Sequence, residues 1–240
     1  SGQTIVIDIY NTSTIKVSNN FGNSFTTINL NDIITLGTSV TLITKTALSS
    51  GGATIIIVVF VDGLFPNNQF RILKSTNYGA SFSDITDNVG FPFTGAADFV
   101  GIQDALVSGD GKYEIYFNVY GPSRYSDDYG QTFVDKAYPQ TDWDESGKIN
   151  ETGQYFMLSG SALPAVYSTD FGVSTSLSSV PGATQFDAGV SNSGKFSSTT
   201  GSNTFPNNNI KFSNDFFNTF TSVNYNSLNV RRPFILIDVS

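Results

Sequence analysis

The stretch SDDYGQTF at residues 126–133 has the composition of a tight turn followed by a buried ring. Ser126 and Asp128 can hydrogen-bond to the backbone of their own turn, and Gly130 can adopt a positive φ that other residues disfavour. Phe133 can then pack beneath the turn. Four further segments share the pattern: SNNFGNSF (18–25), STNYGASF (75–82), STDFGVST (168–175) and SNDFFNTF (213–220). The five copies predict five similar β-hairpins.

This eight-residue pattern resembles the Asp-box, or bacterial neuraminidase repeat, whose form is S-x-D-x-G-x-T-[W/F]. All five segments carry Asn or Asp at the third position, while Phe217 replaces the glycine of the last copy and Thr175 the ring of the fourth. The resemblance implies a β-propeller in which each motif joins the two outer strands of a blade.

A second repeat alternates with the first. A small polar turn containing a glycine precedes a strand-like segment in SSGGATIIIVVF (Gly52), SGDGKYEIYFNV (Gly111), NETGQYFML (Gly153) and SNSGKFSST (Gly194). These turns predict hairpins between the two inner strands of each blade. The chain ends in LIDVS and begins with SGQTIVI, so joining its tail to its head gives a fifth copy, with its glycine at Gly2.

The two interlocked repeats predict an all-β fold, in which residues 1–240 form a single domain, a five-bladed β-propeller of four-stranded antiparallel blades. The 240 residues give 48 per blade (240/5), which fits the roughly 40–50 residues of known propeller repeats. We expect the C-terminal strand to pair with the N-terminal blade, closing the ring and covering two sheet edges. A Greek-key sandwich needs no interlocked repeats, and a β-helix has shorter and more uniform periods.

Charge and hydropathy exclude two classes of partner. The formal net charge is −8, from 12 basic and 20 acidic residues, and no run of Lys or Arg occurs. We therefore expect no nucleic-acid partner. The longest apolar run, TIIIVVFV at 54–61, falls short of the ~20 residues that span a bilayer, so we expect no membrane insertion.

The chain contains no histidine and no cysteine, which removes the commonest general base, the commonest metal ligand and all thiolate chemistry. We therefore expect no catalytic residue and no cofactor. The low lysine content and the abundance of Asn, Ser and Thr favour an extracellular, cell-surface or virion setting.

Aromatic and amide side chains gather in the loops predicted at one end of the blades. Amides bond sugar hydroxyls in pairs and a ring covers the apolar face of a pyranose, so this combination is typical of a lectin-like carbohydrate site. The same residue types also form Asn-rich turns that plug the mouth of a ring. The predicted ligand-binding residues are Phe65, Asn68, Trp143, Phe205, Asn207 and Arg231.

The resemblance includes sialidases, whose chemistry requires an arginine triad, a Tyr–Glu nucleophile pair and an Asp acid. Arg71 and Arg124 are predicted on outer strands, and Arg231 and Arg232 are adjacent, so their side chains point apart in an extended segment. The chain is therefore expected to be a non-sialidase member of the Asp-box family.

Paired carboxylates leave a different hydrolase open as the alternative function. The predicted inner strands carry five acidic residues: Asp104, Asp144, Glu145, Asp187 and Asp238. Acidic residues near a propeller axis also line hydrated channels without any catalytic role. A glycoside hydrolase is thus the second candidate.

The segment DWDESGKIN at 142–150 matches the start of a calcium loop, with Asp142, Asp144, Ser146 and Asn150 at positions one, three, five and nine. It lacks an acid at position nine and a glutamate at position twelve, and it overlaps a predicted inner strand. We expect a polar strand here and no metal.

The sequence therefore favours non-catalytic recognition of a glycan or a protein surface by the loops of a propeller. A purely structural surface protein is the third candidate.

Overall fold

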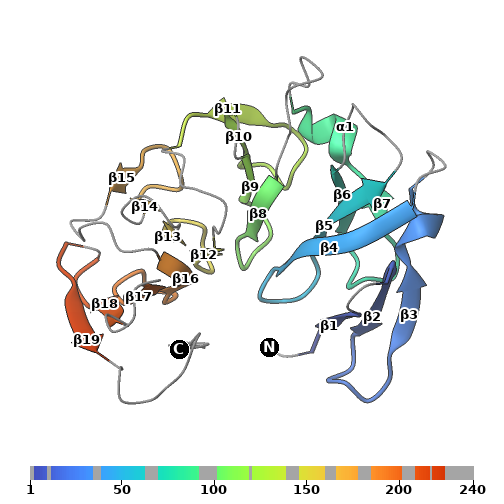
Figure 1. The fold of residues 1–240 in the computed structure, drawn as a ribbon, viewed down its shortest axis with the longest axis horizontal. Helices are drawn as coiled ribbons and strands as arrows, with labels where there is room; N and C mark the ends of the chain where they lie inside the picture. The colour runs from blue at the N-terminus through green and yellow to red at the C-terminus, as the bar shows by residue number, and fades with distance from the viewer. Residues whose placement is uncertain are drawn as a thin grey trace. The chain divides into compact units, whose positions relative to one another are not determined.

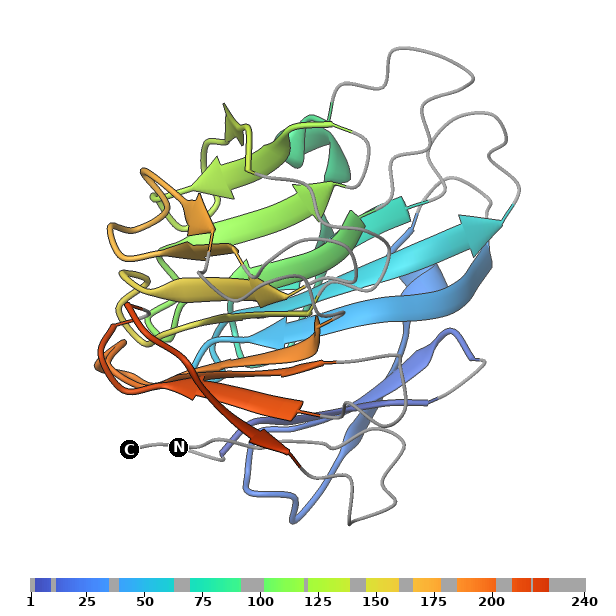
Figure 2. The ribbon, with the colours of Figure 1, turned by 60° about the vertical axis from the view of Figure 1, so that its left-hand side comes forward.

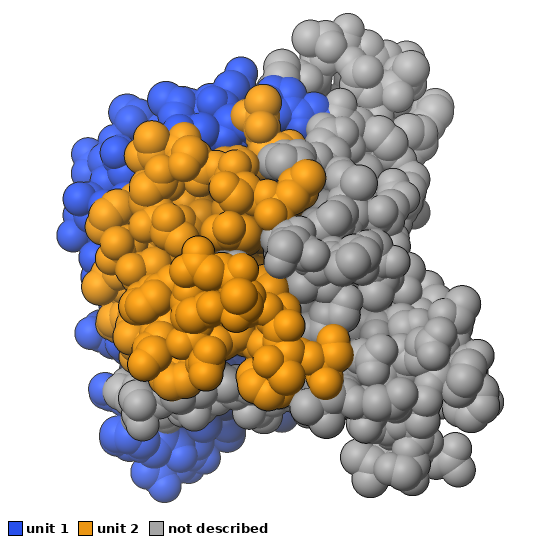
Figure 3. Space-filling model, turned by 90° about the vertical axis from the view of Figure 1, so that its left-hand side faces the viewer, with its two compact units in different colours: residues 1–136 blue, residues 137–240 orange. Residues whose placement is uncertain are grey.

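The computed structural model describes residues 3–9, 12–34, 39–62, 70–91, 102–118, 121–138, 146–159, 166–177, 185–201, 209–216 and 218–224. These residues form five antiparallel sheets that follow one another in the sequence (Figure 1). The chain divides into two compact units, Ser1–Lys136 and Ala137–Ser240, which Figure 3 colours separately. The boundary falls between two sheets, so each unit contains whole sheets. A single domain over all 240 residues stays a prediction.

The first unit holds three sheets, whose strands are ordered as they occur in the chain. The first sheet contains β1 (Ile5–Asp8), β2 (Thr14–Ser18) and β3 (Thr26–Asn29). The second contains β4 (Ser39–Leu48), β5 (Ile55–Asp62), β6 (Phe70–Ser75) and β7 (Ser83–Asp84). The third contains β8 (Ile102–Val107), β9 (Glu114–Asn118), β10 (Ser123–Ser126) and β11 (Val134–Lys136). Two short helices, η1 (Leu30–Asp32) and α1 (Thr86–Val89), follow the last strands of the first two sheets.

The second unit holds two four-stranded sheets, again in chain order. One contains β12 (Ser146–Ile149), β13 (Phe156–Ser159), β14 (Val166–Ser168) and β15 (Ser176–Leu177). The other contains β16 (Gln185–Val190), β17 (Ser197–Gly201), β18 (Asn209–Ser213) and β19 (Thr221–Asn224).

The connections at one end of the sheets have constant lengths. Six residues join the first and second strands in all four four-stranded sheets: 49–54, 108–113, 150–155 and 191–196. Seven residues join the last two strands in all five sheets: 19–25, 76–82, 127–133, 169–175 and 214–220. Because the strands are antiparallel, both sets of turns lie at the same end of their sheets. The two predicted repeats are these inner turns and outer turns.

The connections at the other end vary. The segments between the second and third strands are 9–13, 63–69, 119–122, 160–165 and 202–208, which span four to seven residues. Figure 2 shows the tight turns at one end of the strands. The variable end is therefore where one copy of the repeat differs most from another.

The apolar run at 54–61 forms β5, a strand buried on both of its faces. Ile55, Ile57, Val59 and Val61 pack with residues of the first sheet such as Ile15 and Val17. The alternate residues Ile56 and Val58 pack with the third sheet, which contributes Ile102, Ala105 and Tyr116. Alternation along a strand sends neighbouring side chains to opposite faces, so a strand between two sheets is apolar at every position.

These findings confirm the predicted all-β fold of four-stranded antiparallel sheets, and five sheets fit five blades. The first sheet shows three strands, and β1 pairs with β2 along one edge. The strand predicted to complete it lies within residues 225–240, outside the described residues, so ring closure stays a prediction.

Candidate functional site

Each outer turn is built around the first serine and the third residue of its motif. In the third sheet, the Ser126 hydroxyl accepts the Gly130 N–H at 2.9 Å and donates to Asp128 Oδ1 at 2.7 Å. The other carboxylate oxygen of Asp128 accepts the Thr132 hydroxyl at 2.6 Å, and Oδ1 also accepts the Thr132 N–H at 2.9 Å. The bonds from Thr132, then that from Ser126, lower the pKa of Asp128 to about 2. The carboxylate is thus a structural acceptor.

Asparagine makes the same bonds in the first two copies. Asn20 Oδ1 accepts the Ser24 N–H at 3.0 Å, and its Nδ2 donates to the Ser24 hydroxyl at 2.8 Å. The amide reverses the direction of the side-chain bond and leaves the turn unchanged. This explains why the third position accepts either residue type.

The fourth motif position had no role assigned from the sequence. Its backbone N–H ties the outer turn to the segment that precedes another strand. It is aromatic in every copy and adopts positive φ: Phe21, Tyr78, Tyr129, Phe171 and Phe216, at 58–63°. Its N–H donates to the carbonyl two residues before β1, β5, β9, β13 or β17: Gln3, Ala53, Lys112, Gln154 and Lys195. The signal was visible as a ring in all five copies. Positive φ was predicted for the glycine alone, but the aromatic residue before that glycine adopts it as well.

In the second and third copies the fifth position leaves no room for a side chain, because the backbone lies against other side chains. A Cβ at Gly79 would lie 2.6 Å from Val17 Cγ1 and 3.2 Å from Ile55 Cδ1. A Cβ at Gly130 would lie 2.6 Å from both Lys74 Nζ and Glu114 Oε2. Gly79 and Gly130 occupy equivalent positions in successive sheets, but Gly79 faces apolar side chains and Gly130 faces charged ones.

The charged place is a fully buried network between the second and third sheets. Lys74 Nζ donates to Glu114 Oε1 at 2.5 Å and to the Tyr129 carbonyl at 2.7 Å. The Tyr116 hydroxyl donates to Glu114 Oε2 at 2.9 Å. Burial raises the pKa of Glu114 against the opposing attraction of Lys74, and burial beside Glu114 raises that of Tyr116. Every polar atom of the pair has a partner, as a buried charge requires.

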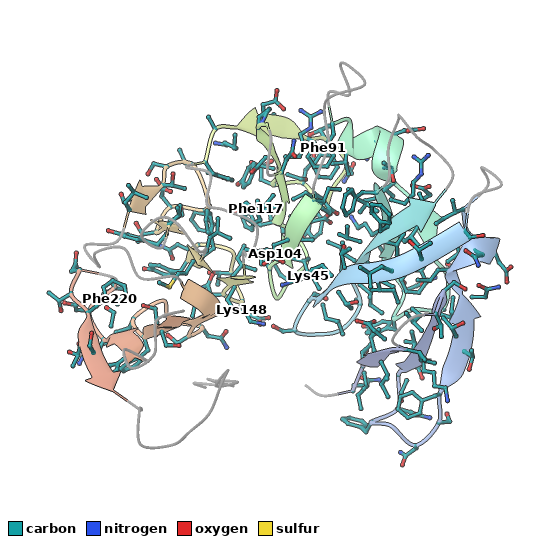
Figure 4. The ribbon with its side chains drawn as sticks, in the orientation of Figure 1. Lys45, Phe91, Asp104, Phe117, Lys148 and Phe220 are labelled. Atoms are coloured by element: carbon teal, nitrogen blue, oxygen red, sulfur yellow. The ribbon has the colours of Figure 1, made fainter. Side chains whose placement is uncertain are left out.

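The first strands of the second and third sheets carry a second charged pair. Lys45 Nζ lies 2.6 Å from Asp104 Oδ1, and Figure 4 shows the two side chains turned toward each other from β4 and β8. Each residue directly follows an irregularity in its strand, between Ile43 and Lys45 and between Ile102 and Asp104. A β-bulge re-aims the side chains that follow it, so these bulges bring the pair together.

A second contact lies on the opposite face of β4, because Thr46 follows Lys45 directly and successive strand residues face opposite sides. The Thr46 hydroxyl lies 3.1 and 3.0 Å from the two carboxylate oxygens of Asp8. Desolvation by burial raises the pKa of Asp8, and the bond from Thr46 opposes that rise. The two contacts therefore hold one carboxylate paired with an ammonium group and one partly desolvated carboxylate.

These two contacts are a poor match to paired acid–base catalysis. Asp104 is fully buried and paired with an ammonium group, so it lacks the access to solvent or substrate that a general acid needs. Asp187 lies on the first strand of its own sheet, as predicted, but its side chain is outside the described part. Asp144, Glu145 and Asp238 are also outside the described residues.

The two described arginines serve structural contacts on third strands, as predicted. Arg124 donates from Nε to the Val89 carbonyl at 2.7 Å, donates to the Gly90 carbonyl, and pairs with Asp135. It thereby caps the C-terminus of α1. Arg71 is buried, with its Nε 3.9 Å from Asp84 Oδ2. Arg231 and Arg232 lie outside the described residues.

The described half of the calcium-like segment is a strand and a turn. Residues 146–149 form β12, and Asn150 is buried, with its amide oxygen accepting the Tyr155 N–H at 3.0 Å. Its amide nitrogen donates to the Asn192 carbonyl at 2.7 Å. Asp142 and Asp144 are not among the described residues. Within the described ranges, no three His, Cys, Asp or Glu side chains form a group suited to a metal ion.

All six predicted ligand-binding residues lie outside the described residues. Phe65 and Asn68 fall between β5 and β6, Phe205 and Asn207 between β17 and β18, Trp143 between β11 and β12, and Arg231 after β19. Their assignment to the variable end of the sheets stays a prediction.

Comparison with known proteins identifies the fold. No family model and no curated protein matches the chain. Among solved structures, a GH74 enzyme from Niastella koreensis superposes on 93% of the chain with TM-score 0.58 and 14% identity. TolB from Acinetobacter baumannii superposes on 92% of the chain with TM-score 0.58 and 13% identity. A chain of a nidogen/laminin complex superposes on 92% of the chain with TM-score 0.58 and 6% identity.

These neighbours are β-propeller proteins, so the chain has a propeller fold. It covers 37% and 52% of the lengths of the GH74 and TolB chains. The described part of the chain contains no helix with the length and apolar character to cross a membrane.

Proposed function

We propose that this chain is a non-catalytic recognition module that binds a glycan or a protein surface through the variable end of its sheets. The observation that carries the proposal is the contrast between the two ends. All nine inner and outer turns within the strand pairs have fixed lengths of six and seven residues, whereas the opposite connections range from four to seven. Variable loops on a rigid framework are where binding residues concentrate.

The strands deliver these loops in a defined register. Phe60 pairs with Phe70 at the start of the 63–69 connection, and their rings meet edge-on with centroids 5.3 Å apart. Gly201 pairs with Asn209 across the 202–208 connection. Both connections contain Phe and Asn, in LFPNN and TFPNN. The combination supplies a stacking face and amide groups, which suits sugar hydroxyls or a polar protein surface.

A glycoside hydrolase is the second candidate, because the structural neighbours include GH74 enzymes. The ion pair between Lys45 and Asp104 speaks against it, since one of the five candidate carboxylates is already neutralised. TolB and the nidogen/laminin complex show that propellers of similar fold also occur in proteins outside that enzyme family. A purely structural surface role is the third candidate.

Three further statements belong to the same proposal. The turn motifs are Asp-boxes, the tail strand pairs with β1 so that five blades close one ring, and the protein works in an extracellular, cell-surface or virion setting. The bond from the Phe21 N–H to the Gln3 carbonyl supports closure, because it repeats the lock that follows an inner hairpin in the other four sheets.

The experiment is a glycan array and a binding-partner screen with the wild-type chain and with Phe65→Ala, Trp143→Ala and Phe205→Ala variants. We expect at least one loop variant to lose about tenfold or more in affinity, as central aromatic contacts do. Val173→Ala, an exposed apolar residue of the outer turn 169–175 at the opposite end of the sheets, is the control. Equal affinity of all variants contradicts the proposed site, and turnover of a bound glycan transfers the assignment to the hydrolase.

A further inference from the structure

Three outer turns of the first unit display strained aromatic residues to solvent. Phe21, Tyr78 and Tyr129 have φ of 60°, 60° and 63°, and 65%, 43% and 54% of their surfaces are exposed. Left-handed backbone is unfavourable for bulky side chains, and Asn or Gly adopts it more readily. A strained residue that persists at an exposed position is a reason to look for a function.

The local structure makes no use of these rings. Their turns are fixed by the N–H groups of the same residues, which any non-proline residue supplies. Within the described part of the chain, the three rings have no stacking partner, and the Tyr78 and Tyr129 hydroxyls have no hydrogen bond. The equivalent Phe216 differs, because its ring lies against Tyr155 with centroids 5.9 Å apart.

The three turns follow one another along the constant-length end of the first unit. The backbone N–H of each ring residue bonds to the carbonyl two residues before β1, β5 or β9, through Gln3, Ala53 and Lys112. The inner turns of the second and third sheets are joined by the Ser50 N–H and the Gly109 carbonyl, 3.1 Å apart. The three outer turns therefore present one ring per sheet at the constant-length end of the first unit.

We propose that Phe21, Tyr78 and Tyr129 form a second binding surface, the aromatic turn row, which takes a neutral polysaccharide. A ring face stacks on the apolar C–H face of a pyranose, and the tyrosine hydroxyls bond to sugar hydroxyls. Successive rings on successive sheets suit a chain in which the same apolar face recurs.

Charge and patch shape decide between classes of ligand. The three motifs contain no Lys or Arg, and the third contains Asp127 and Asp128, so a polyanion is disfavoured. Each ring directly follows a polar residue, Asn20, Asn77 or Asp128, which suits a ligand rich in hydroxyl groups better than an apolar protein surface. A neutral polysaccharide is the ligand class that meets both conditions. This surface does not depend on the loop site proposed above, and either can fail alone.

The test is affinity electrophoresis through gels containing xyloglucan, laminarin, mannan or dextran, with the full chain and a Phe21→Asn/Tyr78→Asn/Tyr129→Asn variant. We expect at least one polysaccharide to retard the wild type and the triple variant to lose about tenfold or more of that affinity. Because Asn suits left-handed backbone, the melting temperature of the variant should stay equal or rise.

Two matched variants separate the possible results. Tyr78→Phe/Tyr129→Phe should keep most of the binding, since the ring face is retained, and Phe65→Ala/Phe205→Ala should keep all binding that depends on the row. The proposal is overturned if no neutral polysaccharide retards the wild type, or if the triple variant binds as the wild type does. A fall in the melting temperature of the triple variant also overturns it, because the rings would then be structural. Retention by a polyanion or a protein alone overturns the ligand class.

Discussion

The first serine of each turn motif shows how one small side chain satisfies a buried turn. Ser18, Ser75, Ser126, Ser168 and Ser213 are all at most 2% exposed. In the four copies that retain glycine, the hydroxyl accepts the N–H of that residue and donates to the Asn or Asp at position three. A buried hydroxyl with both functions satisfied costs little, whereas an alanine would leave a buried N–H without its acceptor.

The contribution of Asp128 to the stability of its turn can be tested by changing the pH. Its pKa is lowered to about 2, first by the bonds from Thr132, so the carboxylate stabilises the folded chain above its ordinary pKa. That contribution is lost as the pH falls from about 4 through the folded value, because the unfolded chain then binds the proton more readily. Asp128→Asn should show a weaker loss of stability between about pH 4 and pH 2 than the wild type does.

Urea unfolding at a series of acidic pH values measures this difference. The chain supplies its own precedent, because Asn20 and Asn77 already build the same turn without a titrating group. Identical acid profiles for the variant and the wild type would show that the Asp128 bonds do not stabilise the turn.

At the scale of elements, neighbouring sheets meet through one repeated place with two chemistries. Val17 and Ile55 fill it between the first two sheets, and Lys74 with Glu114 fills it between the second and third. A buried ion pair is often no more stabilising than an apolar pair of similar volume, yet removing one partner is costly. The charged Lys74–Glu114 contact therefore distinguishes the interface between the second and third sheets from the apolar interface between the first two. We expect it to specify which sheets pack together more than to stabilise the fold.

Substitution of the network should follow that asymmetry. Glu114→Leu alone strands the Lys74 ammonium and should lower the free energy of unfolding by about 3–5 kcal/mol. Lys74→Met/Glu114→Leu/Tyr116→Phe removes all three polar partners and should return to within about 1–2 kcal/mol of the wild type or exceed it. Chemical denaturation of the single and combined variants measures the recovery. If the triple variant is as unstable as the single one, apolar residues cannot replace the charged network in the way that Val17 and Ile55 pack between the first two sheets.

Turn chemistry is why the elements were predictable and the links between them were not. Ser, Asn or Asp, and Gly at fixed spacing determine a turn within eight residues, so the motif at 126–133 and its copies located all the outer hairpins. Lys74 and Glu114 are 40 residues apart, and nothing local indicates that they meet. The Lys45–Asp104 pair depends in addition on two bulges, which the strand pattern does not reveal.

For the whole molecule, the alternation of two turn types was sufficient to predict the number of sheets. The predicted binding residues could not be placed, because they lie in the 63–69, 139–145, 202–208 and 225–240 stretches outside the described residues. The sequence of those stretches lacks the repeated motif that allowed the turns to be derived from one another. The sequence therefore constrains the framework more than the surface that we propose it presents.

Ring closure can be tested by cross-linking, since the chain has no cysteine. In the other sheets the last residue of the first strand pairs with the first residue of the second, as Leu48 with Ile55. The same register, with Ser240 followed by Ser1, predicts Asp238 opposite Ile5. An Ile5→Cys/Asp238→Cys variant should form an intramolecular disulfide in good yield under mild oxidation, because the predicted spacing suits the bond.

Ile5→Cys/Val239→Cys is the control, because a shift of one residue turns the second thiol to the opposite face of the strand. Mobility on denaturing gels with and without reductant reports the cross-link. Equal yields for the two variants, or none for either, would contradict closure in this register.

The fixed turn lengths also imply that the two ends of the sheets differ in how well they tolerate inserted residues. An extra residue within 127–133 would displace the Tyr129 N–H from the Lys112 carbonyl and disturb the buried Lys74–Glu114 contact beneath it. A peptide spliced between Asp62 and Phe70 would meet no such lock, since the neighbouring strands are held by their own ladder and ring contact. New specificities can therefore be grafted at one end of the strands while the other end preserves the architecture.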